Sequence, residues 1–257
     1  MPKAKKSGLE NIEKTRNTSD MLDFYSELSD FVASVDMPDI EKMFSFPVFA
    51  TRQSITRLIE RYEIYKLIET VPGTILDTGT GSGFGLMAFA HFCTIFEGYN
   101  YTRRLVGFDT FEGFTEPAPQ DRTSKAAHMK KGGLAFDSYE ILQRAIAIHD
   151  RNRVLGHIPK VEVIKGNISD TLPAYIEANP HLVVALLYLD MDLYRPTKDT
   201  IELLVPRIPR GGVIVFDEIN HADYPGETTA VMETLGLSNL RLRRLPISST
   251  ASFAIVE

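Results

Sequence analysis

Four carboxylates follow two strongly apolar segments of the sequence. Asp190 and Asp192 lie in YLDMDLY, and Asp217 and Glu218 lie in VIVFDEIN. Packing several carboxylates together is unfavourable unless a cation neutralises their charge. Oxygen ligands without cysteine suit Mg²⁺ or another hard divalent cation, which lowers the pKa of a bound hydroxyl. The sequence therefore predicts a metal site formed by Asp190, Asp217 and Glu218.

The general base of such a site has two candidates. Asp192 follows Asp190 by two residues, so both side chains would face the same side of an extended chain. In that position Asp192 could take the proton of the metal-bound hydroxyl. His221 follows Asp217 by four residues and is the competing candidate. The spacing leaves three possibilities open for the base, namely Asp192, His221 or neither.

A glycine-rich turn lies earlier in the chain, in ILDTGTGSG (residues 75–83), before the apolar segment LMAFAHFCTIF. Glycine permits a tight turn and lets a ligand approach the backbone closely. Counting from Gly79, the sixth position is Phe84, so the dinucleotide fingerprint Gly-x-Gly-x-x-Gly fails. We therefore expect S-adenosylmethionine here, with its ammonium group bonded to Asp77; a turn without a ligand is the alternative. The expected cofactor contacts of this turn are Asp77, Thr78, Gly79, Gly81 and Gly83.

Two further strand ends complete the expected cofactor site. Asp109 ends the second expected strand, where a carboxylate can chelate the two ribose hydroxyls, and Thr110 follows it. Asn167 and Ile168 follow the third expected strand, in the loop that flanks the adenine in this kind of fold. Asp190 is the remaining expected contact. A loop cap is the simpler alternative for Asp109, but the order of these residues along the chain favours a cofactor site.

Periodicity indicates the elements that position these residues. Apolar residues recur at helical spacing over Ser19–Val35, with Ser19 as N-cap, and over Gln53–Glu69. From Pro72 onwards strands and helices alternate. We expect strands at residues 74–77, 104–109, 161–165, 183–190, 212–217, 241–247 and 252–256. We expect further helices at residues 85–96, 138–149, 172–178, 197–205 and 228–235.

This alternation predicts an α/β fold with a doubly wound, Rossmann-like sheet. The last two strands are separated by Ser248–Ala251 alone, so they must pair as an antiparallel hairpin. Five parallel strands closed by a C-terminal hairpin form the mostly parallel, seven-stranded arrangement of class I methyltransferases. We therefore expect an N-terminal tail and helical lid over residues 1–70, and a methyltransferase domain over residues 71–257.

The irregular segment Pro117–Gly133 follows the second expected strand, on the side of the sheet where doubly wound folds bind ligands. A long loop at that place is more often a functional lid than a mobile surface loop. The lid carries four residues that could meet a phosphate or another acidic group of the acceptor, namely Lys125, His128, Lys130 and Lys131.

Composition excludes several classes of protein. The 257 residues carry a net charge of −6, and the pI is near 5.6, which argues against a nucleic-acid partner. The longest strongly apolar stretch, LVVALLYL, is too short to cross a membrane. Cys93 is the single cysteine, which excludes an internal disulfide and fits a reducing, cytoplasmic location.

Three segments carry a resemblance to a known family: GFDTFEGF (residues 107–114), GNISDTLP (166–173) and LDMDLYRPTKDTIELLVPRIPRGGVIVFDE (189–218). Over about residues 46–257 the chain resembles the macrocin O-methyltransferases, which are similar to antibiotic-sugar O-methyltransferases of macrolide and aminocoumarin pathways. The resemblance implies Mg²⁺ dependence, a sugar hydroxyl as acceptor and often a homodimer or larger homo-oligomer. It also matches Asp190, Asp217 and Glu218 to metal positions and Asp192 to the base.

The glycine turn departs from the Glu-Cys-Gly of that family, and Glu218 stands where many members carry Asp. The segment FATRQSITRLIERYEIYKLI (residues 49–68) resembles a branch of the family from glycan or natural-product pathways. That likeness implies that the carboxylate end of the cofactor is lined by Arg52, Arg61, Tyr62 and Glu63; a surface helix is the alternative.

The combined expectation is methyl transfer from S-adenosylmethionine to a metal-bound hydroxyl of a sugar or a glycosylated natural product. A catechol-type O-methyltransferase acting on an aromatic diol would use the same metal chemistry and is the nearest alternative. A nicotinamide oxidoreductase is a distant one. A binding protein for S-adenosylmethionine without catalysis is the non-enzyme alternative.

Overall fold

The structure is a computed structural model that describes residues 18–257. The first part of the expected N-terminal tail, residues 1–17, lies outside the described residues. The chain divides into two compact units, and the division falls between Thr56 and Arg57. The boundary between lid and methyltransferase domain was expected near residue 70, so it differs from this division. The role of residues 1–70 as a lid stays a prediction.

The first unit consists of short helices. They are α1 (Ser19–Ser34), α2 (Asp39–Phe44), α3 (Phe46–Phe49) and the first residues of α4 (Arg52–Ile68). The N-cap of α1 is Thr18 and not Ser19, because the Thr18 hydroxyl accepts a hydrogen bond of 3.3 Å from the N–H of Met21. The rings of Phe31 and Phe49 stack within this unit, with centroids 5.8 Å apart.

The second unit is built on a seven-stranded sheet with the order β3-β2-β1-β4-β5-β7-β6. Its strands are β1 (Thr74–Thr78), β2 (Leu105–Asp109), β3 (Val161–Lys165), β4 (Val184–Leu189), β5 (Val213–Phe216), β6 (Arg243–Arg244) and β7 (Ser252–Ile255). Strands β1 to β5 are parallel, and β7 is antiparallel to both β5 and β6. The expected α/β class, strand number and terminal hairpin are therefore confirmed.

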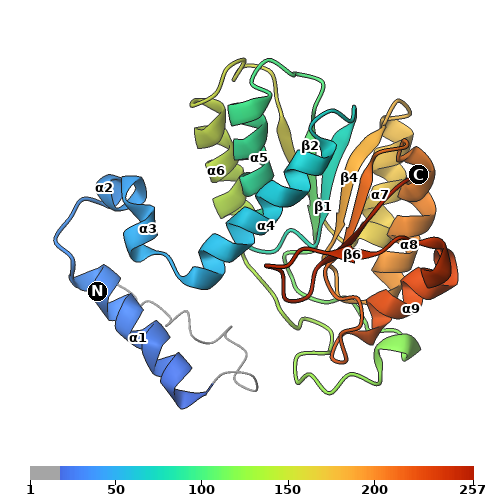
Figure 1. Cartoon of the computed structure of the whole chain (residues 1–257), viewed down its shortest axis with the longest axis horizontal. Helices are drawn as coiled ribbons and strands as arrows, with labels where there is room; N and C mark the ends of the chain where they lie inside the picture. Colours follow the sequence, from blue (N-terminus) through green and yellow to red (C-terminus); the bar gives the residue numbers. More distant parts are fainter. Residues whose placement is uncertain (1–17) are drawn as a thin grey trace. The chain divides into compact units, whose positions relative to one another are not determined.

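Helices cover both faces of the sheet (Figure 1). Besides α4, they are α5 (Phe84–Phe96), α6 (Tyr139–Asp150), α7 (Ile168–Ala178), α8 (Tyr194–Leu204) and α9 (Pro225–Thr234). Short 3₁₀ helices lie at Pro119–Asp121, Val205–Arg207 and Leu237–Asn239. Helices α4, α5 and α6 pack on one face and α7, α8 and α9 on the other, each over its own apolar core. Because β4 is buried along its whole length, it reads as continuously apolar in the sequence.

Helix and strand ends differ from expectation where a side chain or a proline intervenes. Helix α7 begins at Ile168 and not Leu172, because the Asn167 side chain caps it by accepting from the N–H of Ser169. The sixth strand is much shorter than residues 241–247, since Pro246 has no N–H to donate to a ladder.

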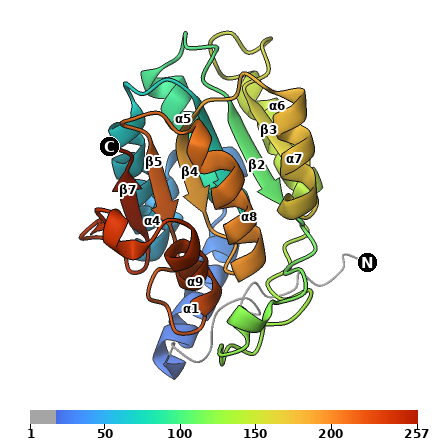
Figure 2. The same ribbon diagram turned by 90° about the vertical axis from the view of Figure 1, so that its right-hand side faces the viewer.

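Helix α8 also begins earlier than expected, at Tyr194 and not Thr197. The cause lies far away in sequence, because the buried carboxylate of Asp121 accepts a hydrogen bond of 2.9 Å from the N–H of Tyr194. The same carboxylate accepts from the N–H of Ala118 at 2.8 Å. Asp121 thus ties the loop after β2 to the first turn of α8, and Figure 2 shows this loop and α9 at the same edge of the sheet.

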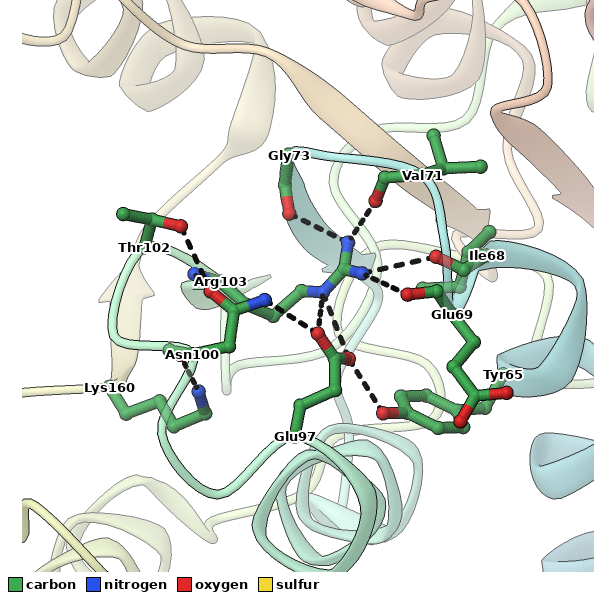
Figure 3. Close-up of polar contacts among 10 residues, drawn as sticks. All are labelled: Tyr65, Ile68, Glu69, Val71, Gly73, Glu97, Asn100, Thr102, Arg103 and Lys160. Atoms are coloured by element: carbon green, nitrogen blue, oxygen red, sulfur yellow. Dashed lines mark hydrogen bonds and ion pairs between the residues drawn. The ribbon is translucent and has the colours of Figure 1, made fainter.

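Arg103 fixes the end of α4 to the start of β1 (Figure 3). Its guanidinium donates to the carbonyl oxygens of Ile68 at 3.0 Å, Val71 at 2.7 Å and Gly73 at 2.9 Å. Its Nε donates to the Glu97 carboxylate, which also accepts from the hydroxyl of Tyr65 at 2.6 Å. One buried cation therefore satisfies carbonyl groups that the end of a helix leaves without partners. Within the described part of the chain, no helix has both the length and the apolarity to cross a bilayer.

Candidate active site

A cavity of about 270 Å³ lies at the carboxyl edge of the parallel strands. We call it the carboxyl-edge cavity. It is lined by the glycine turn after β1, by the residues that follow β2, β3 and β4, and by one side of α4. Doubly wound folds bind ligands at this edge, near the point where the strand order reverses. In this sheet that point is β1, because β2 and β3 follow on one side of it and β4 and β5 on the other.

The glycine turn closes tightly against the end of β4. Gly79 has a positive φ of 87°, and a Cβ there would lie 1.7 Å from the carbonyl oxygen of Asp190. Gly81 also has a positive φ, and a Cβ there would meet its nearest neighbours at 3.8 Å, inside the space of the cavity. The turn therefore needs glycine for its backbone at Gly79 and leaves room for a ligand at Gly81.

The carboxylates at the ends of β1 and β2 both face this turn. Asp77 is buried and lines the cavity; burial raises its pKa to about 6, while the nearby charge of Arg61 lowers it. Asp109 accepts hydrogen bonds from the N–H of Gly81 at 2.7 Å and of Phe111 at 2.6 Å. These two backbone N–H groups therefore fix the orientation of the Asp109 carboxylate beside the glycine turn.

The other expected cofactor contacts divide into two groups. Thr110, Asn167, Ile168 and Asp190 line the cavity together with Asp77, Gly79, Gly81 and Asp109. Thr78 and Gly83 have structural surroundings instead. The Thr78 hydroxyl donates to the carbonyl oxygen of Tyr188 at 2.8 Å, and a Cβ on Gly83 would lie 2.6 Å from Leu142. Neither Thr78 nor Gly83 lines the cavity.

The residues implied by the likeness of residues 49–68 are also separated by the structure. Arg61 lines the cavity. The ring of Tyr62 packs instead on α5, with its centroid 5.4 Å from that of Phe92 and 5.6 Å from that of Phe96. This placement speaks against a cofactor contact by Tyr62. Arg52 lies in the first unit, so its role stays a prediction.

The carboxylates after β4 form a charged wall of the cavity. Asp190 and Asp192 both line it, although the chain between them is not extended, because Asp192 has a left-handed φ of 63°. Burial raises the pKa of Asp192 to about 7, and the charge of Asp217 adds to the effect. Burial and the charges of Asp217 and Asp192 also raise the pKa of Asp190 well above its usual value. A carboxylate with a pKa near neutrality is suited to general-base chemistry.

Asp217 does not line the cavity, and its side chain is bonded to the buried Tyr188. Its Oδ1 accepts a hydrogen bond of 2.9 Å from the hydroxyl of Tyr188, and burial raises its pKa while Arg61 lowers it. Glu218 and His221 lie beyond it, with Glu218 Oε2 and His221 Nδ1 3.6 Å apart. His221 Nδ1 also accepts from the N–H of Asp223 at 3.3 Å.

The fit of these residues to a metal ion can be tested on the geometry. Among residues 18–257, no three His, Cys, Asp or Glu side chains come together closely enough to hold a metal ion. In this arrangement Asp190, Asp217 and Glu218 do not form the three-ligand site that the sequence predicts. The carboxylates do lie close enough for their negative charges to repel one another. One positive group already lies among them, the guanidinium of Arg61.

The structure adds cavity residues that sequence reasoning did not identify. Arg57 precedes Arg61 by one helical turn, and both reach the cavity from α4. The guanidinium of Arg57 lies 4.8 Å from the ring centroid of Phe84, the first residue of α5. The sequence signal for this pair was the spacing of four residues, which places two arginines on the same side of an amphipathic helix. Phe114 and Phe136, at the two ends of the loop after β2, line the cavity without any sequence signal.

That loop is anchored to the loop after β5. The hydroxyl of Ser124 donates to the carbonyl oxygen of Asp223 at 2.6 Å. His128 Nε2 and the hydroxyl of Tyr224 form a hydrogen bond of 2.7 Å, and their ring centroids are 5.7 Å apart. The expected segment Pro117–Gly133 thus lies beside the acidic wall, and its role as a lid stays a prediction, as does the acceptor contact of Lys125, Lys130 and Lys131.

The fold and the cavity define the class of this protein, a class I methyltransferase dependent on S-adenosylmethionine. The profile of the macrocin O-methyltransferase (TylF) family matches residues 52–233. The chain therefore belongs to that family, and its resemblance, its fold class and its class of enzyme are confirmed.

Individual relatives agree with this assignment. Over 156 residues the chain is 31% identical to 8-demethyl-8-(2,3-dimethoxy-α-L-rhamnosyl)-tetracenomycin-C 4′-O-methyltransferase of Streptomyces olivaceus, a match that covers 59% of this chain. The matched stretch spans about half (55%) of that relative. The crystal structure of CalS11, a calicheamicin methyltransferase, is 30% identical with a TM-score of 0.89 and covers 93% of each chain. The O-methyltransferase NovP, at 23% identity, 79% and 80% coverage and a TM-score of 0.62, shares the fold.

Proposed function

We propose that this protein transfers a methyl group from S-adenosylmethionine to a hydroxyl of a sugar. The sugar is attached either to a natural product or to no natural product. The observation that carries the proposal is the carboxyl-edge cavity, which joins the glycine turn to Asp192, a carboxylate with a pKa near 7. Two relatives support the sugar. The tetracenomycin enzyme acts on a rhamnosyl group, and a second CalS11 structure is described as a TDP-rhamnose 3′-O-methyltransferase.

The residues of the cavity fit this cofactor. Gly79 and Gly81 leave backbone exposed along the cavity, Asp77 offers a carboxylate for an ammonium group, and Asp109 stands where a ribose would lie. When bound, S-adenosylmethionine supplies a sulfonium methyl group, which forms a bond to the acceptor oxygen as its carbon–sulfur bond breaks toward sulfur. Asp192 is the proposed base that takes the hydroxyl proton, since it lines the cavity at the end of β4. His221 remains the alternative base.

Assistance by Mg²⁺ or another hard divalent cation is a separate part of the proposal. The support is the gathering of Asp190, Asp192 and Asp217, because the charge of Asp217 raises the pKa of both Asp190 and Asp192. The geometry of the described residues speaks against a preformed site. The effects of a chelator and of added Mg²⁺ on activity test the contribution of a metal.

The assay compares acceptors in the presence of S-adenosylmethionine, with product detection by mass spectrometry. The probes are TDP-rhamnose, a rhamnosylated aromatic polyketide and catechol. We expect one methyl group on a sugar probe and none on catechol. Parallel reactions contain EDTA, or EDTA followed by excess Mg²⁺, and loss of activity that Mg²⁺ restores would support metal assistance.

Other outcomes select the alternatives. Methylation of catechol without either sugar probe would favour the catechol-type enzyme. Binding of S-adenosylhomocysteine in a calorimeter without turnover of any probe would favour a protein that binds the cofactor but has lost catalysis. Unchanged activity in EDTA would overturn the metal part and leave methyl transfer intact. A homo-oligomer, as expected from the resemblance, stays a proposal beside this function.

A further inference from the structure

The side chain of Arg61 is buried at the floor of the carboxyl-edge cavity. Its side chain is 3% exposed, and its guanidinium carbon lies 3.8 Å from the centroid of the Tyr188 ring. Nη1 donates to the carboxylate of Glu60 and to the hydroxyl of Tyr188. We call Glu60, Arg61, Tyr188, Asp190 and Asp217 the Arg61 network. The network joins α4 to β4 and to the end of β5.

The network places one fixed positive charge among several acidic groups. Nη2 of Arg61 is 3.9 Å from Oδ2 of Asp190, and the Tyr188 hydroxyl that accepts from Arg61 donates in turn to Asp217 at 2.9 Å. On the other side, a Cβ on Gly85 would lie 3.3 Å from both Arg61 Nε and Asp77 Oδ1. The guanidinium therefore stands between the carboxylates that end β1, β4 and β5.

One donor of this guanidinium has no partner among residues 18–257. Nε of Arg61 is buried and makes no hydrogen bond, although Arg61 lines the cavity. A buried charged donor without a partner is unfavourable, and positions of this kind are often completed by a ligand. The stacking on Tyr188 holds the plane of the guanidinium, so the charge cannot swing away from the carboxylates.

We propose that Arg61 is a positioning residue that balances the charge of Asp77, Asp190 and Asp217 beside the sulfonium of the cofactor, an inference that rests on the proposed function. Methyl transfer removes the positive charge of the sulfonium. Excess negative charge nearby stabilises the charged reactant more than the transition state, in which that charge is dispersing, and so slows the reaction. Arg61 prevents that excess.

The proposal makes a prediction about binding that is independent of turnover. S-adenosylmethionine and S-adenosylhomocysteine have the same carboxylate, ammonium and nucleoside groups but differ in the charge on sulfur. Without Arg61, the site loses one positive charge and should prefer the cationic ligand. For Arg61→Gln we expect the ratio of the Kd of S-adenosylhomocysteine to that of S-adenosylmethionine to rise on the order of tenfold.

The experiment measures both dissociation constants by calorimetry, and kcat and KM with TDP-rhamnose, for wild type, Arg61→Gln and Arg61→Lys. We expect Arg61→Gln to lower kcat with a small change in the acceptor KM. Arg61→Lys keeps the charge, so the ratio of the two dissociation constants should return toward the wild-type value. Arg103→Lys is the matched control for Arg61→Lys, since Arg103 is also a buried arginine that bonds to the end of α4 but does not line the cavity.

The outcomes separate the role of Arg61 from folding and from the proposed function. Equal weakening of both ligands in Arg61→Gln, or an equal change of the ratio in Arg103→Lys, would assign Arg61 a structural role and overturn the inference. If Arg61→Gln does not fold, Arg61→Met, which also removes the charge, takes its place: a raised ratio in Arg61→Met would support the inference, and an unchanged ratio would overturn it. Absence of ligand binding by the wild type would instead refute the proposed function.

Discussion

Asp77 lies beneath the glycine turn, buried and within the influence of two arginines. Burial raises its pKa to about 6, whereas Arg61 and Arg57 lower it. A carboxylic acid normally has a pKa near 4, so the ionised form of Asp77 is disfavoured in the folded protein without a ligand. An ammonium group bound beside it would reverse this, because it favours the charged form. The residue is therefore sensitive to both pH and cofactor.

We expect the affinity for S-adenosylhomocysteine to fall by about tenfold between pH 7 and pH 5, as Asp77 takes up a proton near pH 6. Calorimetry at both pH values in wild type and Asp77→Asn measures this dependence. The variant should bind weakly at both pH values and lack the part of the dependence due to Asp77. An equal dependence in the two proteins would show that another group controls binding.

The same pKa makes a prediction about stability with a definite sign. Because the folded pKa of Asp77 is raised, its unfavourable contribution is absent below about pH 4 and grows as the pH rises through about 6. Above that range Asp77→Asn should therefore unfold with a larger free energy than wild type, by up to about 3 kcal/mol without ligand. Urea unfolding at pH 4 and pH 8 measures the difference; a larger gain at pH 4 would contradict this sign.

At the scale of elements, α4 is the part of the second unit that connects packing to the cavity. One side of the helix carries Arg57 and Arg61 into the cavity, and Arg103 fixes its C-terminal end to β1. The charge of Arg103 also neutralises Glu97, whose side chain is 8% exposed. Loss of this arginine leaves a buried carboxylate and several carbonyl oxygens without their partner.

We expect Arg103→Ala to lower the free energy of unfolding by about 3–5 kcal/mol. Arg104→Ala is the matched control, because Arg104 is the next residue but is 41% exposed and pairs with Glu162 at 3.6 Å. Its loss should cost less than about 1 kcal/mol. Chemical unfolding followed by circular dichroism measures both variants. Similar effects for the two would mean that the contacts of Arg103 do not stabilise the end of α4.

The elements also show what could be predicted from the sequence. Local patterns predicted strand order along the chain, the glycine turn and the terminal hairpin, because periodicity and turn residues act over short distances. The start of α8 was missed because Asp121, far away in sequence, caps it. The Arg61 network was missed for the same reason: the contact between α4 and β4 depends on tertiary packing, and no local pattern encodes it.

At the scale of the whole molecule, the cavity brings together the ends of four parallel strands, so that a cofactor site and an acidic wall share one space. Family membership fixes the class of chemistry. In our proposal, Asp77 and the glycine turn contact the cofactor, and Asp192 contacts the acceptor. The sequence predicted most of these residues as strand-end positions. The distances between their side chains follow from tertiary packing, and their pKa shifts follow from burial, so neither could be predicted from local sequence patterns.

In our proposal, a sugar hydroxyl accepts the methyl group within the carboxyl-edge cavity. The most direct test supplies S-adenosylmethionine with a trideuterated methyl group to the wild type and to Asp192→Asn, with TDP-rhamnose as acceptor, and follows the product by mass spectrometry. We predict that the wild type adds one trideuteromethyl group to the sugar. The variant should bind S-adenosylhomocysteine with little change and lose at least about 100-fold in kcat, as expected for removal of a general base. If the wild type binds the cofactor but labels neither TDP-rhamnose nor, in a parallel reaction, the rhamnosylated polyketide, methyl transfer to a sugar hydroxyl is contradicted.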